Sequence, residues 1–515
     1  KEVRLVIKTY AQHAHGQAAK GADRGDIRPE ETDDTLNTDL TSDLYHAFRN
    51  KAALVFANSR TDVERYADAL NRRAERAGGP CRFRAHHGSL ARSIREEAEE
   101  ALRAGAPTVA LCTSTLELGI DIGNVTSIGQ LEPPWSVNAL AQRLGRSGRH
   151  DGEASELWMF VEEAAPDQAH SIVDRLAPKL LHAVALVELL LERWCEPPDL
   201  ERLHISTLVQ QILSVIAQTG GSTANVLFDA LVQHGPFRNV DQATFVEVLR
   251  NMGQADLIEQ APEGPLILGL SGERIVRGMD FYAVFLAKTE LRVVAAGRAI
   301  GTVDASPSVD VGTHLILAGR RWKILEIDAR RREVLVEPSR AGKVPRFQTA
   351  GSAEIHAMVR RKMRDVLSRD DVPAYLDATG RHMLTAARRT AREAHVLQSP
   401  WFVDGAQTAW FTWTGSCINR TLVAIGRYAA NLEALDEGVA LMFPNADPAE
   451  VQAAYAEALR HPPAPQDLAA TFPVKATEKY EGMLSDALQT TVFAQNSLDL
   501  PGALAVIAAA LGATR

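Results

Sequence analysis

Residues 111–125 read LCTSTLELGIDIGNV, and residues 139–150 read ALAQRLGRSGRH. The first run is a short apolar strand followed by three hydroxyl side chains and a turn containing glycine. The second is a helix that ends in a glycine-spaced turn carrying Arg146 and Arg149. Arginine is permanently charged and binds phosphate through parallel hydrogen bonds, so both residues suit a nucleotide held across a cleft. In phosphoryl-transfer enzymes such an arginine stabilises the charge of the transition state.

Apolar runs alternate with helical patterns on both sides of this stretch. Residues 52–57 (AALVFA) read as a buried strand, and Thr61 with Glu64 fits a capping box that opens a helix ending near Gly78. Strands alternating with helices predict a parallel sheet covered on both faces, here an α/β domain of the RecA-like class. The further expected elements are strands over 83–86, 108–112, 127–131 and 157–161 and a helix over 91–104.

Polar side chains follow three of these strands. Open α/β sheets bind ligands at the carboxyl ends of their strands, so we expect this group to hold nucleic-acid phosphates without reading the base sequence. Residues 58–60 suit an ordinary polar helix cap equally well. We place Gly119 and Asp121 toward the nucleotide cleft, so one short segment would contact both ligands. The expected nucleic-acid contacts are Asn58, Ser59, Arg60, His87, Gly88, Thr113 and Ser114.

Composition limits the class of protein. The 515 residues carry a net charge of −9, but residues 320–392 hold eighteen Lys and Arg against nine Asp and Glu, which favours a local phosphate-binding module. No apolar run suggests a membrane span and no signal-peptide pattern is present, so we expect a cytoplasmic, nucleoid-associated protein. Four dispersed cysteines without metal spacing predict neither disulfides nor a metal site. The absence of an initiating Met favours a fragment or a processed piece.

The sequence predicts a multi-domain chain. Three short helices and a two-stranded wing over 203–270 are typical of a winged helix, although a small helical bundle fits as well. Short strands with glycine-containing turns after Gly272 suggest a barrel or a curled sheet. The expected segments are a strand and linker over 1–50, the RecA-like domain over 51–170, a connecting helix and winged helix over 171–275, a β-rich, barrel-like domain over 276–350 and an α/β region over 351–515.

These motifs resemble the large helicase-related (Lhr) family of superfamily 2 DNA helicases. ALVFANSR (53–60), RAHHGSLAR (84–92), CTSTLELGIDIG (112–123) and QRLGRSGR (142–149) look like helicase motifs IV, IVa, V and VI. HLILAGRRWKILEID (314–328) and WFTWTGSCINRTL (410–422) look like the family's C-terminal module. The resemblance spans roughly residues 45–515.

The resemblance implies roles for particular residues. Gln142 would position the attacking water, Arg146 and Arg149 would be arginine fingers, and Arg143, Gly119 and Asp121 would contact ATP. The family commonly has an aromatic wedge in its β-rich domain. Phe347 is the first candidate here and Trp322 the second, because stacking on an aromatic binds any base. An ordinary core position is an equally good interpretation of Phe347.

The sequence contains no GxxxxGK[ST] pattern and no strand ending in Asp-Glu before these motifs. By resemblance, ATP and Mg²⁺ would be held mainly by a first RecA-like domain that this chain lacks. The chain would be the C-terminal part of an ATP-dependent helicase that moves 3′ to 5′ on single-stranded DNA and unwinds a DNA duplex or RNA:DNA hybrid. The alternative is a nucleic-acid-binding subunit whose motor half is a separate polypeptide. DNA repair is an expected role, but the residues do not decide between repair, RNA processing and defence.

Overall fold

The structure is a computed structural model of the chain, and it forms two compact units that are not consecutive in sequence. The first contains residues 1–196, 289–404 and 413–415, and the second contains 197–288, 405–412 and 416–515. The β-rich segment therefore belongs to the same unit as the RecA-like segment. The structure describes residues 3–12, 36–117, 122–123, 125–148, 154–165, 169, 171–285, 290–304, 311, 313–328, 331–339 and 354–512.

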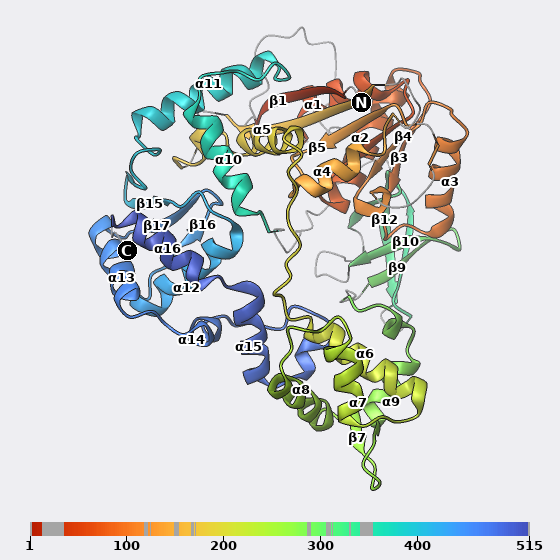
Figure 1. Cartoon of the computed structure of the whole chain (residues 1–515). Coiled ribbons are helices and arrows are strands. Elements are labelled where there is room, and N and C mark those ends of the chain that lie inside the picture. The colour runs from red at the N-terminus through yellow and green to blue at the C-terminus, as the bar shows by residue number, and fades with distance from the viewer. Residues whose placement is uncertain are drawn as a thin grey trace. The chain divides into compact units, whose positions relative to one another are not determined.

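A six-stranded sheet forms the centre of the first unit, with the strand order β1-β6-β5-β2-β4-β3 (Figure 1). Every pairing in it is parallel, which confirms the predicted α/β sheet. β2, β4 and β5 are buried along their whole length, as expected for strands covered on both faces. The strands are β1 (Val3–Gln12), β2 (Ala53–Phe56), β3 (Phe83–His86), β4 (Val109–Cys112), β5 (Ser127–Leu131) and β6 (Ser155–Ala164).

The segment predicted as a strand and linker over 1–50 is part of this fold. β1 pairs with β6 along its full ten residues, and α1 (Thr38–Phe48) lies where polar composition suggested a linker. Phe48 of α1 is fully buried against the sheet at Gly129, where an added Cβ would lie 3.0 Å from the Phe48 ring and 2.9 Å from Val55. Glycine at 129 therefore lets α1 approach the sheet closely.

Helices connect the strands of the sheet. α2 (Arg60–Arg76) begins two residues earlier than predicted because Ser59, and not Thr61, is its N-cap: the Ser59 hydroxyl accepts a hydrogen bond from the Asp62 N–H at 3.0 Å. The other helices of the first unit are α3 (Arg92–Arg103), α4 (Val137–Leu144), α5 (Pro178–Leu191), α10 (Ala357–Ser368) and α11 (Ala378–Glu393).

The β-rich segment forms a five-stranded sheet with the order β10-β9-β13-β12-β11. It is a mixed sheet, because β13 pairs in parallel with β9 while the other neighbours are antiparallel. Within the described residues its two outer strands, β10 and β11, are not paired with each other, so this part of the sheet is open and not a closed barrel. The strands are β9 (Glu290–Ala295), β10 (Arg298–Asp304), β11 (His314–Leu317), β12 (Arg320–Asp328) and β13 (Glu333–Pro338), and β14 (Trp401–Asp404) also belongs to this unit.

This second sheet is fixed to α2 through a buried carboxylate. Oε1 of Glu64 accepts a hydrogen bond from the Ala318 N–H at 2.8 Å and lies 2.8 Å from His87 Nε2, while Oε2 accepts from the Gly319 N–H at 2.5 Å. Ala318 and Gly319 form the left-handed turn between β11 and β12, with φ of 58° and 65°. Glu64 therefore joins α2, the loop after β3 and this turn.

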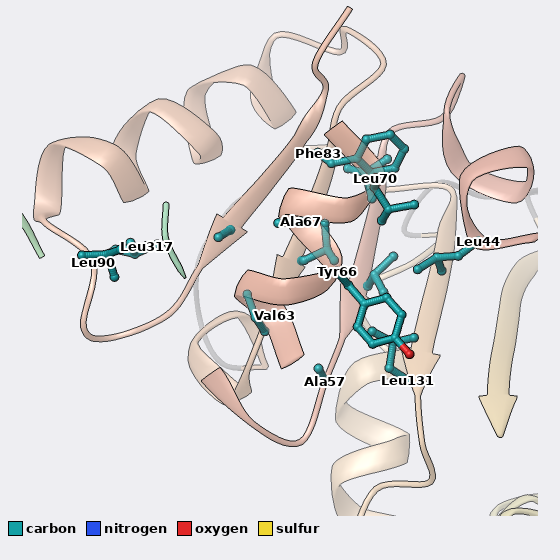
Figure 2. Close-up of a cluster of buried hydrophobic side chains, with 14 of the residues drawn as sticks. Leu44, Ala57, Val63, Tyr66, Ala67, Leu70, Phe83, Leu90, Leu131 and Leu317 are labelled. Carbon is teal, nitrogen blue, oxygen red and sulfur yellow. The ribbon is translucent and has the colours of Figure 1, made fainter. Parts of the chain in front are cut away.

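Apolar packing continues across the same contact. A single buried cluster includes Val63 and Leu70 of α2, Leu90 after β3, and Leu317 and Trp322 of the second sheet. Figure 2 shows this cluster, with the side chains of α2 directed toward the sheet strands. The two sheets of the first unit therefore share one hydrophobic core.

The second unit contains the predicted three-helix segment. α6 (Ile205–Thr219), α7 (Ala224–Phe228) and α8 (Gln242–Gln254) are followed by the antiparallel pair β7 (Ile258–Gln260) and β8 (Leu266–Leu268). The helix predicted over 223–234 is divided, because residues 229–233 form a π-helical turn. Tyr480 and Leu488, from near the end of the chain, complete the core of these helices.

The remaining described elements of the second unit are α9 (Leu270–Arg277), β15 (Gln407–Phe411), α12 (Ser416–Ala430), β16 (Leu435–Asp436), β17 (Ala440–Pro444), α13 (Pro448–Arg460), α14 (Pro465–Ala470), α15 (Asp486–Ser497) and α16 (Leu500–Ala510). Among the described residues no single helix is long and apolar enough to cross a membrane, and one bent helix pair, Asp486–Ser497 with Leu500–Ala510, passes that test by length and composition.

The Glu64→Ala variant should be strongly destabilised. It removes the acceptor for two buried backbone N–H groups, and each unsatisfied buried group costs about 1–3 kcal/mol, so we expect a loss of roughly 2–5 kcal/mol in the free energy of unfolding. Urea unfolding of the whole chain measures the loss, and hydrogen exchange at Ala318 and Gly319 localises it. Glu75→Ala, at an exposed position on the same helix, is the control. Equal stability of the two variants would contradict the assigned role of Glu64.

Candidate nucleic-acid and nucleotide site

Three loops with polar residues lie at one edge of the six-stranded sheet. β2, β4 and β3 are neighbours and run in parallel, so the segments after Phe56, Cys112 and His86 leave the sheet on the same side. Asn58 is fixed there by a hydrogen bond from its side-chain amide to the Pro133 carbonyl at 2.9 Å. Its Oδ1 is buried and accepts no hydrogen bond within the described part of the chain.

The loop after β4 presents hydroxyl groups at this edge. Ser114 is exposed and Thr113 is half-buried where the short helical turn 114–116 begins. Thr115 turns inward, because its hydroxyl contacts the His86 carbonyl at 3.2 Å and the His86 ring at 3.0 Å. Burial lowers the pKa of His86, which favours a neutral ring at this contact. Thr113 and Ser114 therefore have the accessible hydroxyl groups.

Gly88 and His87 have opposite environments, although they are neighbours. Gly88 is exposed, and a Cβ added to it would meet no atom within 4 Å, so its backbone is open to a ligand. The His87 side chain is 2% exposed and contacts Glu64. The His87 ring is therefore not open to a phosphate in this structure, and the nucleic-acid contact of His87 stays a prediction.

Arg60 and Ser59 are already engaged by protein groups. The Arg60 guanidinium bonds to the Ser89 hydroxyl and lies 3.3 Å from Glu290 and 3.9 Å from Asp304 of the second sheet. About half of the Arg60 side chain remains exposed, at 51%. Ser59 uses its hydroxyl to cap α2. Arg60 would have to exchange a carboxylate for a phosphate in order to bind nucleic acid.

The helix α4 carries the residues expected at the nucleotide. Ser136 caps its N-terminus, and the Glu196 carboxylate accepts hydrogen bonds from the Val137 N–H at 2.7 Å and the Asn138 N–H at 2.9 Å. Gln142 is exposed and Arg146 is half-buried near the other end of the helix. Glu196 could not be recognised from the sequence as the partner of this helix, because it lies 59 residues from Val137.

Arg143, predicted to contact ATP, is instead an internal residue. It is 6% exposed, and its Nε and Nη2 lie 2.7 and 2.6 Å from Glu117 while Nη1 donates to Gln130 at 2.6 Å. The guanidinium also lies over the Phe56 ring. With its donors directed inward, Arg143 joins the segment after β4 to α4 and is not available to a nucleotide. Sequence reasoning did not identify Glu117 as its partner.

One segment links the two candidate regions. The chain leaves the carboxyl end of β4 at Thr113, passes Glu117, and at Val125 makes a parallel bridge with Ser147, just after α4. The Gly148 N–H also donates to the Val125 carbonyl at 3.1 Å. The segment therefore contacts the turn that carries Arg146.

Some predicted residues stand apart from this site. Trp322, the second candidate for base stacking, lies in the shared core and is only 8% exposed. Its indole N–H donates to the Leu317 carbonyl at 2.8 Å, so no ring face is open for a base. Gly119, Asp121, Arg149 and Phe347 lie outside the described residues.

Comparison with known proteins identifies relatives of this chain. Residues 37–151 match the model of the helicase conserved C-terminal domain. The sequence is 38% identical over 128 residues, 24% of the chain, to the ATP-dependent helicase Lhr-Core of Sulfolobus acidocaldarius, of which it covers 15%. It is 25% identical over 375 residues, 62% of the chain, to the Lhr helicase/uracil glycosylase of Escherichia coli, of which it covers 23%.

A solved structure shares the fold. The chain superposes on Mycobacterium smegmatis helicase Lhr bound to ssDNA and AMP-PNP with a TM-score of 0.61 and 19% identity, covering 98% of this chain and 68% of that chain. The predicted resemblance to the Lhr family of superfamily 2 helicases is confirmed. The chain covers only 14% to 34% of the length of the curated Lhr relatives.

The Arg143→Ala variant should lose stability. Removing one partner of a buried ion pair leaves the Glu117 charge uncompensated, which costs about 3–5 kcal/mol. Replacing both partners, as in Glu117→Leu with Arg143→Met, should restore most of the loss. Thermal and urea unfolding of the whole chain measure this, with Gln142→Ala, at the exposed neighbouring position, as the control. An Arg143→Ala variant as stable as the control would show that the guanidinium has no internal role.

Proposed function

We propose that this chain, of the Lhr type, is the C-terminal part of an ATP-dependent DNA helicase or translocase. One observation carries the proposal: the segment 113–125 leaves the polar edge of the sheet and reaches the turn after α4 that carries Arg146. In this proposal, the edge that binds nucleic acid and the helix that faces the nucleotide are joined by one short stretch of chain, which contacts the turn after α4 at Val125. The match of residues 37–151 to a helicase domain supports the same function.

DNA would bind through its backbone. Gly88 offers an open main chain, Thr113 and Ser114 offer hydroxyls, and Asn58 holds the adjoining loop. None of these groups requires a particular base, and phosphate contacts position a strand without specifying its sequence. Such binding suits a motor that advances along single-stranded DNA. We expect this motor to act on chromosomal DNA in the cytoplasm, at the nucleoid.

ATP would bind between this unit and a first RecA-like domain. Gln142 and Arg146, with Arg149 by resemblance, supply amide and guanidinium groups, which fit the phosphates of a nucleotide. No group of three acidic, His or Cys side chains that could hold a metal occurs in the described ranges, so we assign the Mg²⁺ ligands to the other domain. On binding, the metal neutralises phosphate charge. The residues of this chain orient the terminal phosphate and stabilise its developing charge.

Coupling would pass through buried contacts. The Arg143 and Glu117 ion pair fixes the segment after β4 to α4, so a shift at the DNA-facing loop would move the helix that carries Gln142 and leads into the turn with Arg146. Packed interiors transmit such shifts because they are nearly incompressible. We further propose that α6, α7, α8 and the β7–β8 pair form a winged helix, on the basis of three helices followed by an antiparallel pair.

ATP hydrolysis by this chain alone is the first test. Because the phosphate-cradling lysine loop is absent from the sequence, we expect no turnover above background, with or without single-stranded DNA. Turnover should appear when the chain is joined to, or mixed with, a first RecA-like domain that carries a Walker motif. DNA-stimulated turnover by the chain alone would contradict the half-site proposal.

Arg146→Ala should separate hydrolysis from DNA binding in the complete motor. The loss of an arginine finger lowers turnover by about a thousandfold or more, while DNA affinity should change less than about twofold because Arg146 is absent from the DNA edge. Arg92→Ala, at an exposed position on α3, serves as the control. Steady-state ATP hydrolysis and fluorescence anisotropy provide the two measurements. Parallel loss of both activities would assign Arg146 to folding or DNA binding instead.

A further inference from the structure

A polar cavity lies between α1 and the C-terminal half of α2. We call it the arginine pocket. Among the described residues, five arginines and one carboxylate line it: Arg49, Arg72, Arg73, Arg76, Arg321 and Asp68. The residues come from α1, α2 and β12, all within the first unit. Such an excess of one charge within a cavity favours an anionic ligand.

The single carboxylate is fully used. Asp68 lies 3.0 Å from Arg321 and 3.2 Å from Arg72, and both Asp68 and Arg321 have side chains less than a tenth exposed. This arrangement holds Arg321 and Arg72 at the inner wall of the pocket. Asp68 therefore does not neutralise Arg49 or Arg73.

Two of the other arginines have no acidic partner. The guanidinium carbons of Arg49 and Arg73 each lie 5.7 Å from the centre of the buried Tyr45 ring. Arg73 also donates to the neutral Ser42 hydroxyl at 2.8 Å. Within the described ranges neither arginine forms an ion pair with Asp or Glu. The Tyr45 ring thus positions two charged groups whose remaining donors are unused by carboxylates.

Helix stabilisation explains part of this composition, but not all of it. Arginine near the last turn of α2 interacts favourably with the partial negative charge of a helix C-terminus. That effect does not account for Arg321, which belongs to β12 and not to α2. It also does not explain why arginines from α1, α2 and β12 line one cavity. Like charges held this close repel each other unless an anion lies between them.

The pocket is separate from the DNA edge. α2 starts at that edge with Arg60, and Arg72 is twelve residues further along the helix. At 1.5 Å per residue this corresponds to about 18 Å, so a phosphate at Gly88 or Ser114 would not occupy the pocket.

We propose that the arginine pocket is an auxiliary binding site for adjacent phosphate groups, either from a phosphorylated nucleotide or from consecutive phosphates of a nucleic-acid strand. Arginine forks bind phosphate oxygens with paired hydrogen bonds, and several forks together favour a polyphosphate over a single phosphate. Tyr45 is buried and covered by arginines, so recognition is by charge and not by base stacking. The proposal does not depend on helicase activity.

Binding of tripolyphosphate to the whole chain tests the proposal by isothermal titration calorimetry at low salt. The variant Arg49→Gln with Arg73→Gln should reduce affinity about tenfold or more, because it removes two charged donors that hold no carboxylate in place. A control variant, Arg92→Gln with Arg277→Gln, removes two exposed charges elsewhere and should change affinity less than about twofold. If the double variant unfolds, the tripolyphosphate affinity of Arg49→Gln alone, at an exposed position, replaces it in the test and should also be reduced.

A short oligothymidylate distinguishes the two sources of phosphate. If the pocket receives a nucleic-acid strand, the Arg49 and Arg73 double variant weakens oligonucleotide binding and tripolyphosphate competes with the oligonucleotide. If it receives a free nucleotide, only tripolyphosphate binding is affected. Arg60→Gln reports the DNA edge independently and should leave tripolyphosphate binding unchanged. Absence of tripolyphosphate binding by the wild-type chain, or equal affinity of the double and control variants, would overturn the proposal.

Discussion

Parallel pairing of all six strands is the constraint on which the first unit depends. Parallel strands need long connections, and these connections place every strand end of the same kind at one edge of the sheet. The polar loops after β2, β3 and β4 therefore lie together although they are separated in sequence. The same constraint requires apolar side chains on both faces, which is why β2, β4 and β5 are buried throughout.

Buried charged groups then fix the positions of the second sheet and of α4, which apolar packing alone would not specify. Glu64 holds the turn at Ala318 and Gly319, and Asp68 holds Arg321, so two carboxylates one helical turn apart attach the second sheet to α2. Glu117 and Arg143 do the same for α4. Each carboxylate is surrounded by donors, which is the condition under which a buried charge can be tolerated. These contacts give the unit a defined geometry as well as stability.

The positions of the central strands could be predicted from the sequence, but the contacts of several side chains could not. β3 and β5 have the predicted bounds, although neither is a continuous apolar run: β3 reads FRAH and β5 reads SIGQL. β1 was not assigned to the sheet because its partner β6 is about 150 residues away. The sequence did not indicate the burial of His87 and Trp322, because it depends on Glu64, which is 23 residues from His87, and on the core that the two sheets share at Trp322. Arg143 could have been recognised as internal, since Val137, Leu140 and Arg143 recur every three residues on the buried side of α4.

The Glu196 carboxylate has a mechanical consequence. Glu196 ends the first of the three chain segments that make up the first unit, and its carboxylate accepts two hydrogen bonds from the first turn of α4. Two prolines, Pro197 and Pro198, follow it and stiffen the chain that leads into the second unit. A pull on the chain at Pro197 would therefore act first on the N-terminal turn of α4, the helix that bears Gln142, and only then on the sheet.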